Sequence, residues 1–276
     1  MLKQIEVTQL SKAFKEIVAL DNVTFDLEQG QILGFLGPSG SGKTTMINIL
    51  TGQLKADAGT ATVFGKDVTA LSRYDLQKIG IMSDVVGFYD KMTVEDNLLF
   101  FAKFHQVPVE RVYDLMETLD LDKVRKKKAE ALSTGMKQRM LFIRAILHQP
   151  ALVFLDEPTS GMDPTLAQNV HQLLIHLKHQ GMTIFLTTHN MTEASKVCDK
   201  ITILHKGHIV ESGSPSEIIA RHSQPDAIEL TYRSGKKVIV KQSELAAYLD
   251  HDIASMRSHE VSLEQLFISL TEENDV

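Results

Sequence analysis

The sequence has little cysteine, no long apolar run and no excess of positive charge. Its one cysteine, Cys198, has no second thiol with which to form an internal disulfide, so the chain fits a reducing compartment. No segment approaches the ~20 apolar residues that span a membrane. The charged start, MLKQIEVTQLSKAF, lacks the apolar core of a signal peptide. We therefore expect any work at a membrane to need a partner.

The net charge also limits the class of protein. A formal charge of −6 argues against a general nucleic-acid binder, so phosphate would have to be bound by local geometry. Hydrophobic residues make up 43% of the chain and charged residues 23%, which predicts a buried core. The length of 276 residues fits one large domain, with or without a small appendage.

Apolar patterning predicts strands and helices in alternation. Residues 5–10 and 23–27 alternate as half-buried strands do. An apolar run over 31–36 stops at a glycine-rich loop, and a helix closed by Gly52 follows. The stretches ALVFLDEP (151–158) and MTIFLTTH (182–189) predict strands buried on both faces, as in a parallel sheet. The helix between them would have Asp163 as its cap, Pro164 as its first residue and Gly181 as its stop, which gives a βαβ unit.

The middle of the chain is predicted to be mostly helical, over about residues 72–147. Ser72 and Thr93 are expected to cap helices there. The basic run RKKK, at 125–128, is interpreted as a solvated face. A hairpin is expected around Lys206 and Gly207.

The pattern changes beyond about residue 221. A hairpin is expected over residues 227–241, with its turn at Ser234 and Gly235. A helix should follow from a capping box of Ser262 and Gln265. We therefore predict one domain over 1–220 and a small C-terminal α+β appendage over 221–276.

The stretch GPSGSGKTT is a candidate phosphate loop, because it lies between a predicted strand and a predicted helix. Its glycines let backbone N–H groups turn toward phosphate oxygens, and the helix aims its positive end at them. Lys43 would reach the β- and γ-phosphates, and the Thr44 hydroxyl would ligate Mg²⁺. The predicted binding residues are Gly37, Pro38, Ser39, Gly40, Ser41, Gly42, Lys43, Thr44 and Thr45.

Polar residues end the two apolar strands. Asp156 and Glu157 close LVFLDE; the aspartate would hold the Mg²⁺ shell, and the glutamate would orient or deprotonate the attacking water. His189 closes MTIFLTTH. A lone histidine is usually only a satisfied polar residue, but this one lies where parallel sheets place ligand chemistry. Phe14, more often a core position, could stack on a base, and the lack of an Asn-Lys-x-Asp stretch favours ATP over GTP.

A second, weaker anion site is predicted at LSTGMKQR, residues 132–139. Ser133 can cap a helix that begins near Thr134, whose free N–H groups form an anion site without any lysine. A chain with one phosphate loop has no evident need of such a site.

These motifs, in this order, resemble the ATP-binding subunits of ABC transporters over about residues 3–220. GPSGSGKTT resembles the family's Walker A loop, and LVFLDE its Walker B strand. SGMD, which ends at Asp163, lies at the D-loop position. His189 lies at the switch-histidine position, and Phe14 at the position of the aromatic that stacks on adenine. LSTGMKQR resembles the signature segment, usually written LSGGQ.

The resemblance implies a fold and an assembly. The fold would be α/β: a P-loop NTPase core with a mostly parallel sheet, an N-terminal antiparallel β subdomain and a helical subdomain. Family members form head-to-tail dimers, here a homodimer or a dimer with a second ATP-binding subunit. Ser133 and Gly135 of one subunit would then contact the γ-phosphate held by the other.

The family also implies a role at the membrane. The chain would be an ATPase that uses ATP and Mg²⁺ to power a separate integral membrane transporter subunit. It would lie peripherally on the cytoplasmic face of the cell membrane and bind no nucleic acid. LSTGMKQR and the tail SLEQLF resemble subunits of two-component exporters that move drugs, antimicrobial peptides or lipids.

The sequence departs from the family pattern at two places. Asp84 stands at the position where the family has a loop glutamine that acts as a metal ligand. Asp84 is therefore a candidate metal ligand, together with Thr44 and Asp156. Thr134 and Met136 replace the usual glycine and glutamine of the signature. These departures leave open a nucleotide-binding subunit with weak or no turnover. A second alternative is a soluble ABC-type switch that acts on ribosomes or DNA, as some relatives in the family do.

Overall fold

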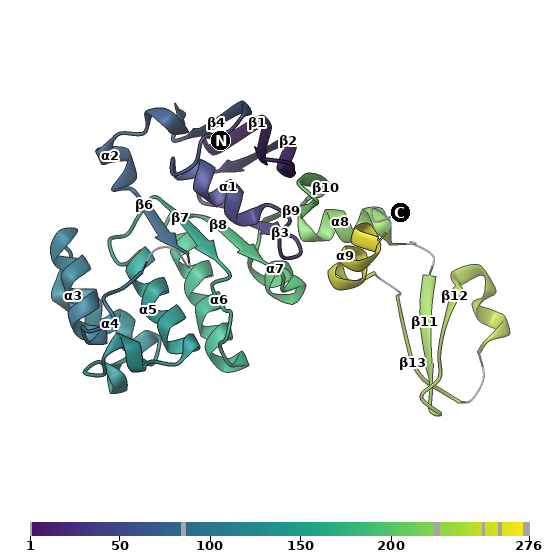
Figure 1. Ribbon diagram of the computed structural model, residues 1–276. Helices are drawn as coiled ribbons and strands as arrows, with labels where there is room; N and C mark the ends of the chain where they lie inside the picture. The colour runs from purple at the N-terminus through teal and green to yellow at the C-terminus, as the bar shows by residue number, and fades with distance from the viewer. Residues whose placement is uncertain (1, 84–86, 224–226, 250–251, 259–260, 273–276) are drawn as a thin grey trace. The chain divides into compact units, whose positions relative to one another are not determined.

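The structure is a computed structural model that describes residues 2–83, 87–223, 227–249, 252–258 and 261–272 (Figure 1). The chain divides into two compact units, Met1–Ser212 and Gly213–Val276. The predicted division between residues 220 and 221 lies inside helix α8 (Pro215–His222). Within the described ranges, no helix is long and apolar enough to cross a membrane.

A sheet of six described strands forms the centre of the first unit, in the order β10-β9-β3-β8-β7-β6. The bounds are β3 (Ile32–Leu36), β6 (Ile79–Met82), β7 (Leu152–Asp156), β8 (Thr183–Thr188), β9 (Lys200–His205) and β10 (His208–Gly213). The neighbouring strands β9, β3, β8, β7 and β6 of this sheet all pair in parallel. Every residue of β3 and β8 is buried, as expected of strands covered on both faces. The parallel pairing and burial predicted for the two apolar stretches are confirmed.

An antiparallel sheet of four described strands forms the N-terminal part of this unit, in the order β2-β1-β4-β5. Its strands are β1 (Lys3–Phe14), β2 (Ile17–Glu28), β4 (Ala58–Val63) and β5 (Lys66–Asp67). Buried Ile5 and Val7 alternate with more exposed neighbours, which confirms the predicted half-buried pattern. Both long strands extend beyond their predicted ends, because the β1–β2 pairing continues to Phe14 and Ile17.

Phenylalanine rings connect the two sheets in one core. Phe25 of β2 lies with its ring centroid 5.3 Å from that of Phe35 in β3, and Phe35 lies 5.3 Å from Phe185 in β8. Phe154 of β7 continues the row at 5.5 Å from Phe185. The same core includes apolar residues of helix α1 (Lys43–Leu50), so the helix that follows the glycine-rich loop is anchored by packing against both sheets.

Helices dominate the middle of the unit, as predicted, and Figure 1 shows α3, α4 and α5 grouped together. Their bounds are α2 (Arg73–Leu76), α3 (Val94–Phe104), α4 (Val109–Thr118) and α5 (Thr134–Ile146), with short 3-10 turns η1 (Val68–Ala70), η2 (Asp122–Val124) and η3 (Ala129–Ala131). The Ser72 and Thr93 hydroxyls accept the predicted capping hydrogen bonds. The basic run 125–128 is exposed, as predicted.

The helix after β7 has the predicted ends. In α6 (Pro164–His179), Asp163 Oδ1 accepts hydrogen bonds from the N–H groups of Thr165 and Leu166, each at 3.1 Å. Gly181 follows the helix with φ 94°. The next helix is α7 (Met191–Val197), which begins directly after the end of β8. Lys206 and Gly207 form the turn of the predicted hairpin.

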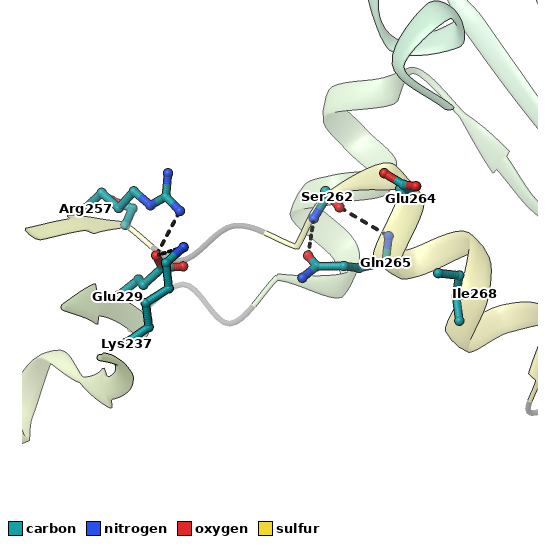
Figure 2. Close-up of a pocket in the computed structure, with 8 residues that line it drawn as sticks. Glu229, Lys237, Arg257, Ser262, Glu264, Gln265 and Ile268 are labelled. Atoms are coloured by element: carbon teal, nitrogen blue, oxygen red, sulfur yellow. Dashed lines mark hydrogen bonds and ion pairs between the residues drawn. The ribbon is translucent and has the colours of Figure 1, made fainter. Parts of the chain in front are cut away.

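The second unit contains an antiparallel sheet in the order β12-β11-β13, within the described residues. Its elements are α8, β11 (Ala227–Tyr232), β12 (Lys237–Lys241), η4 (Gln242–Ala247), β13 (Ile253–Ser258) and α9 (Leu263–Glu272). The predicted hairpin and the capping box are confirmed. Figure 2 shows Ser262 N–H donating to Gln265 Oε1 at 3.0 Å, and Gln265 N–H donating to Ser262 Oγ at 3.2 Å. Strand β13 was not predicted.

Candidate nucleotide-binding site

The glycine-rich loop joins β3 to α1 through a conformation that needs glycine. Gly42 caps the helix with φ 111°. A Cβ atom at that position would lie 2.3 Å from the carbonyl oxygen of Ala19 on β2. The loop therefore packs closely against the antiparallel sheet at Gly42, where a residue with a side chain would not fit.

Lys43 is held by the loop that it follows. Its Nζ donates hydrogen bonds to the carbonyl oxygens of Gly37 at 2.7 Å and Pro38 at 2.9 Å. Burial lowers the pKa of Lys43 below its ordinary value, while the carboxylates of Glu157 and Asp156 act in the opposite direction. The ammonium group is thus largely desolvated and close to two carboxylates, an arrangement that suits a ligand with several negative charges.

Asp156 is brought to the loop by the parallel sheet. Its Oδ2 accepts a hydrogen bond from Thr44 Oγ1 at 3.3 Å, across a large separation in sequence. Its Oδ1 accepts from the hydroxyl of Thr187 on the neighbouring strand β8. Thr44 and Asp156 therefore present oxygen atoms together, which is the donor type that Mg²⁺ prefers.

Glu157 and His189 meet at the carboxyl ends of β7 and β8. His189 Nδ1 lies 2.9 Å from Glu157 Oε1, and the imidazole is otherwise largely exposed. Glu157 has φ 50°, and its N–H donates to the carbonyl oxygen of Thr187 at 3.1 Å. The pair lies at the edge of the sheet where ligands of parallel α/β folds bind.

A cavity of about 340 Å³ joins the loop to the carboxylates. It is lined by Ser39, Gly40, Lys43, Thr44, Gln138, Asp156, Glu157 and Ser160. The structure therefore brings together predicted residues that lie more than a hundred positions apart in the chain. Gln138 and Ser160 were not predicted as site residues. No local pattern in the sequence marks Gln138 as a site residue, whereas Ser160 lies in the segment at the D-loop position.

The other predicted residues of the loop do not line this cavity. The Ser41 hydroxyl is buried and has no hydrogen-bond partner in the described structure, so a polar group at the loop would find a partner there. Thr45 is half-buried in the first turn of α1. Pro38 contributes its carbonyl oxygen to Lys43.

Phe14 and Asp163 do not line the cavity. Phe14 is exposed at the end of β1, with Lys12 Nζ 5.5 Å from its ring centroid. Asp163 caps α6 with its carboxylate. Asp84 lies outside the described residues. Contacts of these residues with nucleotide stay predictions.

The signature segment forms the start of α5, and its Ser133 and Gly135 do not line the cavity. Ser133 is the N-cap, and its Oγ accepts a hydrogen bond from Met136 N–H at 3.3 Å, as predicted. A Cβ atom at Gly135 would lie 2.6 Å from the carbonyl oxygen of Gly161. Close packing within the chain itself therefore favours glycine at position 135, and this contact was not predicted from the sequence.

Comparisons with known proteins agree with this arrangement. Residues 20–160 match the ABC transporter family model. A fluoroquinolones export ATP-binding protein of Mycobacterium tuberculosis is 33% identical over 263 residues, which cover 92% of this chain and 87% of that protein. A bacitracin transport ATP-binding protein of Bacillus licheniformis is 33% identical over 240 residues, which cover 86% of this chain and 78% of that protein.

The fold is also that of solved cassettes. A dimeric structure of a bacterial ABC transporter cassette matches with a TM-score of 0.69 and 24% identity, over 76% of this chain and 98% of that one. With a family model that matches about half of the sequence, and relatives that match along most of their length, the chain belongs to the ATP-binding cassettes of ABC transporters.

Proposed function

We propose that the chain binds and hydrolyses ATP and drives a separate membrane-spanning partner for export. One observation carries the proposal: Lys43, Thr44, Asp156 and Glu157 line one cavity beside the N-terminus of α1. A helix N-terminus and a partly desolvated lysine attract phosphates, while two carboxylates there need a cation or a proton.

The loop residues bind the phosphates in this proposal. Backbone N–H groups of residues 37–45 and the Lys43 ammonium group contact the phosphate oxygens. Lys43 already has its Nζ directed at the loop by two carbonyl oxygens, so its side chain loses little further freedom on binding. The hydroxyl of Ser41, buried without a partner among the described residues, adds a polar group in the loop.

The residues present fit Mg²⁺. Thr44 Oγ1 and Asp156 Oδ2 are 3.3 Å apart and are oxygen donors of the kind that this ion takes. Thr44 and Asp156 would hold the ion, with Asp84 as a further ligand suggested by its place in the sequence. When bound, Mg²⁺ neutralises charge on the phosphate oxygens.

Glu157 acts on the attacking water. Attack on the γ-phosphorus breaks its bond to the bridging oxygen of ADP and transfers one water proton toward Glu157. His189, 2.9 Å from the same carboxylate, keeps that carboxylate oriented and adds a polar group at the γ-phosphate. Asp156 keeps its own orientation through the hydroxyl of Thr187.

The assembly is a head-to-tail dimer of two cassettes. Ser133 and Gly135 do not line the cavity of their own chain, so in this proposal the start of α5 contacts the ATP of a second subunit. ATP then bridges the two chains, and closure is a shift of population toward the dimer that offers both sets of contacts. Asp163, two residues after Gly161 in the D-loop, lies near that interface in the proposal, and Phe14 stacks on adenine.

Export and a peripheral place at the cytoplasmic face of the membrane rest on the relatives. Two of them are named for the export of fluoroquinolones and the transport of bacitracin. In this proposal the contacts that select the cargo of the present chain lie in its membrane partner.

The test is the isosteric change Glu157→Gln. The variant should bind ATP and dimerise as the wild type does, but it should release phosphate at least about 100-fold more slowly, since a general base contributes this much. Turnover like that of the wild type would remove Glu157 from its proposed role.

A further inference from the structure

Glu193 is a buried carboxylate on α7 that does not line the nucleotide cavity. Only 1% of the residue is exposed. Its Oε1 accepts hydrogen bonds from Thr159 Oγ1 at 2.9 Å and from His171 Nε2 at 3.0 Å. Its Oε2 accepts from Thr188 Oγ1 at 2.8 Å. A carboxylate this deep is retained only where its oxygens are satisfied, and here the donors come from separate segments.

The donors are the neighbours of the proposed catalytic pair. Thr159 follows Glu157 by two residues, and Thr188 directly precedes His189. On the other side of His189, the Asn190 N–H donates to Thr188 Oγ1 at 3.0 Å. Glu193 therefore joins the segment that follows one partner of the pair to the segments that flank the other.

The backbone at Glu157 needs such support. Its φ of 50° is uncommon for a residue with a side chain, and it persists only where the surroundings fix it. On the N-terminal side of Glu157, its N–H donates a hydrogen bond to the carbonyl oxygen of Thr187 at 3.1 Å. The hydrogen bond from Thr159 to Glu193 holds the chain just after it. Both sides of the left-handed residue are thus tied to the end of β8.

The His171 contact extends the same network to the helix that follows the D-loop. His171 lies on α6, whose N-cap is Asp163, and its Nε2 shares Glu193 Oε1 with Thr159. A single side chain therefore links the segment after β7, the end of β8 and the middle of α6.

We propose that Glu193 is a positioning residue for ATP hydrolysis, which keeps Glu157 and His189 at hydrogen-bonding distance. The inference rests on the proposed function, since it assigns Glu193 to the same site. Removal of the carboxylate leaves Thr159, Thr188 and His171 without this acceptor. It therefore loosens the segment after Glu157 and the segment around His189, while the phosphate loop stays in place. The predicted defect is in turnover rather than in ATP binding.

Glu95 supplies a matched control. It is also buried, at 6% exposed, accepts a hydrogen bond from Tyr113 Oη at 2.7 Å and pairs with Lys126. It lies on α3, away from the segments of Glu157 and His189. Glu193→Ala and Glu95→Ala therefore remove comparable buried carboxylates, and thermal unfolding measures how far each weakens the fold.

The first measurement is amide hydrogen exchange of the nucleotide-free chain. In Glu193→Ala, peptides covering residues 156–162 and 187–193 should exchange faster than in the wild type, and in Glu95→Ala they should not. This readout does not depend on turnover. Unchanged exchange in Glu193→Ala overturns the inference about Glu193, whether or not the protein hydrolyses ATP. A lack of ATPase activity in the wild type would instead overturn the proposed function.

The second measurement separates binding from turnover. Glu193→Ala should lower kcat by about 10- to 100-fold, as expected for a small displacement of catalytic groups, and should change the Kd for ATP by less than about twofold. Glu95→Ala should keep kcat near that of the wild type. Equal losses of kcat in the two variants, or a loss confined to ATP affinity, overturn the inference.

Thr188 provides the conservative rescue. Thr188→Val removes the hydroxyl at constant shape and should lower kcat in the same direction as Glu193→Ala. Thr188→Ser keeps the hydroxyl and should retain most of the wild-type kcat. If Thr188→Ser and Thr188→Val have the same kcat, packing rather than the hydrogen bond to Glu193 matters at this position, and the inference fails.

Discussion

The rings of His105 and His148 stack with their centroids 4.2 Å apart and their planes 17° apart. His105 follows α3 and His148 follows α5, so the contact joins the ends of two helices. His148 Nε2 also lies 3.3 Å from the carbonyl oxygen of Ile79 at the start of β6. The stack therefore connects the helical region to the edge of the parallel sheet.

This stack should make stability depend on pH. Burial, with the adjacent His105, lowers the pKa of His148 from 6.5 to about 4, and burial also lowers the pKa of His105. Because the unfolded chain binds protons first, the free energy of unfolding should fall as the pH drops from 6.5 toward 4. For a partly exposed group, we expect a loss of about 2 kcal/mol from His148.

Denaturant unfolding at pH 7.5 and pH 5.0 measures the effect. His148→Phe keeps a ring against His105 but cannot take up a proton, so its stability should change less between the two pH values than that of the wild type. The same difference in both proteins would show that the stacked pair does not set this pH dependence.

Gly135→Ala tests the close approach of the signature segment to the D-loop. A Cβ atom there would lie 2.6 Å from the backbone oxygen of Gly161, which cannot rotate away. We expect the free energy of unfolding to fall by about 1–3 kcal/mol, as for other overpacked positions. Gly87→Ala is the control, since no described atom would lie within 4 Å of a Cβ atom at that position.

Thermal unfolding of the nucleotide-free chain separates this effect from any loss of phosphate contacts. A Tm equal to that of the wild type would mean that the backbone near Gly161 adjusts at no cost. Glycine at this position would then be needed only for the ligand of a second subunit.

Asp84→Gln tests the departure at the family's glutamine position. The change restores the usual amide, so we expect ATPase activity to be kept or to rise, measured as phosphate release at saturating Mg²⁺. A collapse of hydrolysis would show that the aspartate has a role of its own, tuned to its charge.

The sequence predicted the features that depend on local patterns. The caps at Ser133 and Asp163 follow from residue type beside an apolar periodic segment, and both are present. Strands β7 and β8 follow from apolar runs of strand length. Strand β6, at four residues, is too short to stand out from a helical region.

The side-chain network of the site could not be predicted in the same way. Thr187 meets Asp156, and Glu193 meets Thr159 and His171, only because β7, β8, α6 and α7 are packed together. Threonine and glutamate are common residues, so nothing in their local spacing marks these contacts. The positions that support a catalytic pair therefore need the fold, whereas the pair itself was marked by the ends of two apolar strands.

Thr187→Val tests whether Asp156 is oriented by its neighbour. The change removes at constant shape the hydroxyl that donates to Asp156 Oδ1, while Asp156 keeps its contact with Thr44. Residues that orient a metal ligand typically contribute 10- to 100-fold to metal affinity. We therefore expect the Mg²⁺ concentration for half-maximal ATPase activity to rise by about 10-fold or more.

Thr183→Val is the matched control for that change. Thr183 lies at the other end of β8, is fully buried and accepts a hydrogen bond from Gly30 N–H at 3.0 Å. Both variants lose one buried hydroxyl from the same strand, so they should weaken the fold to a similar degree. Only Thr187→Val should shift the Mg²⁺ dependence, because only Thr187 contacts the carboxylate beside Thr44. An equal shift in the two variants would place the effect in the strand as a whole.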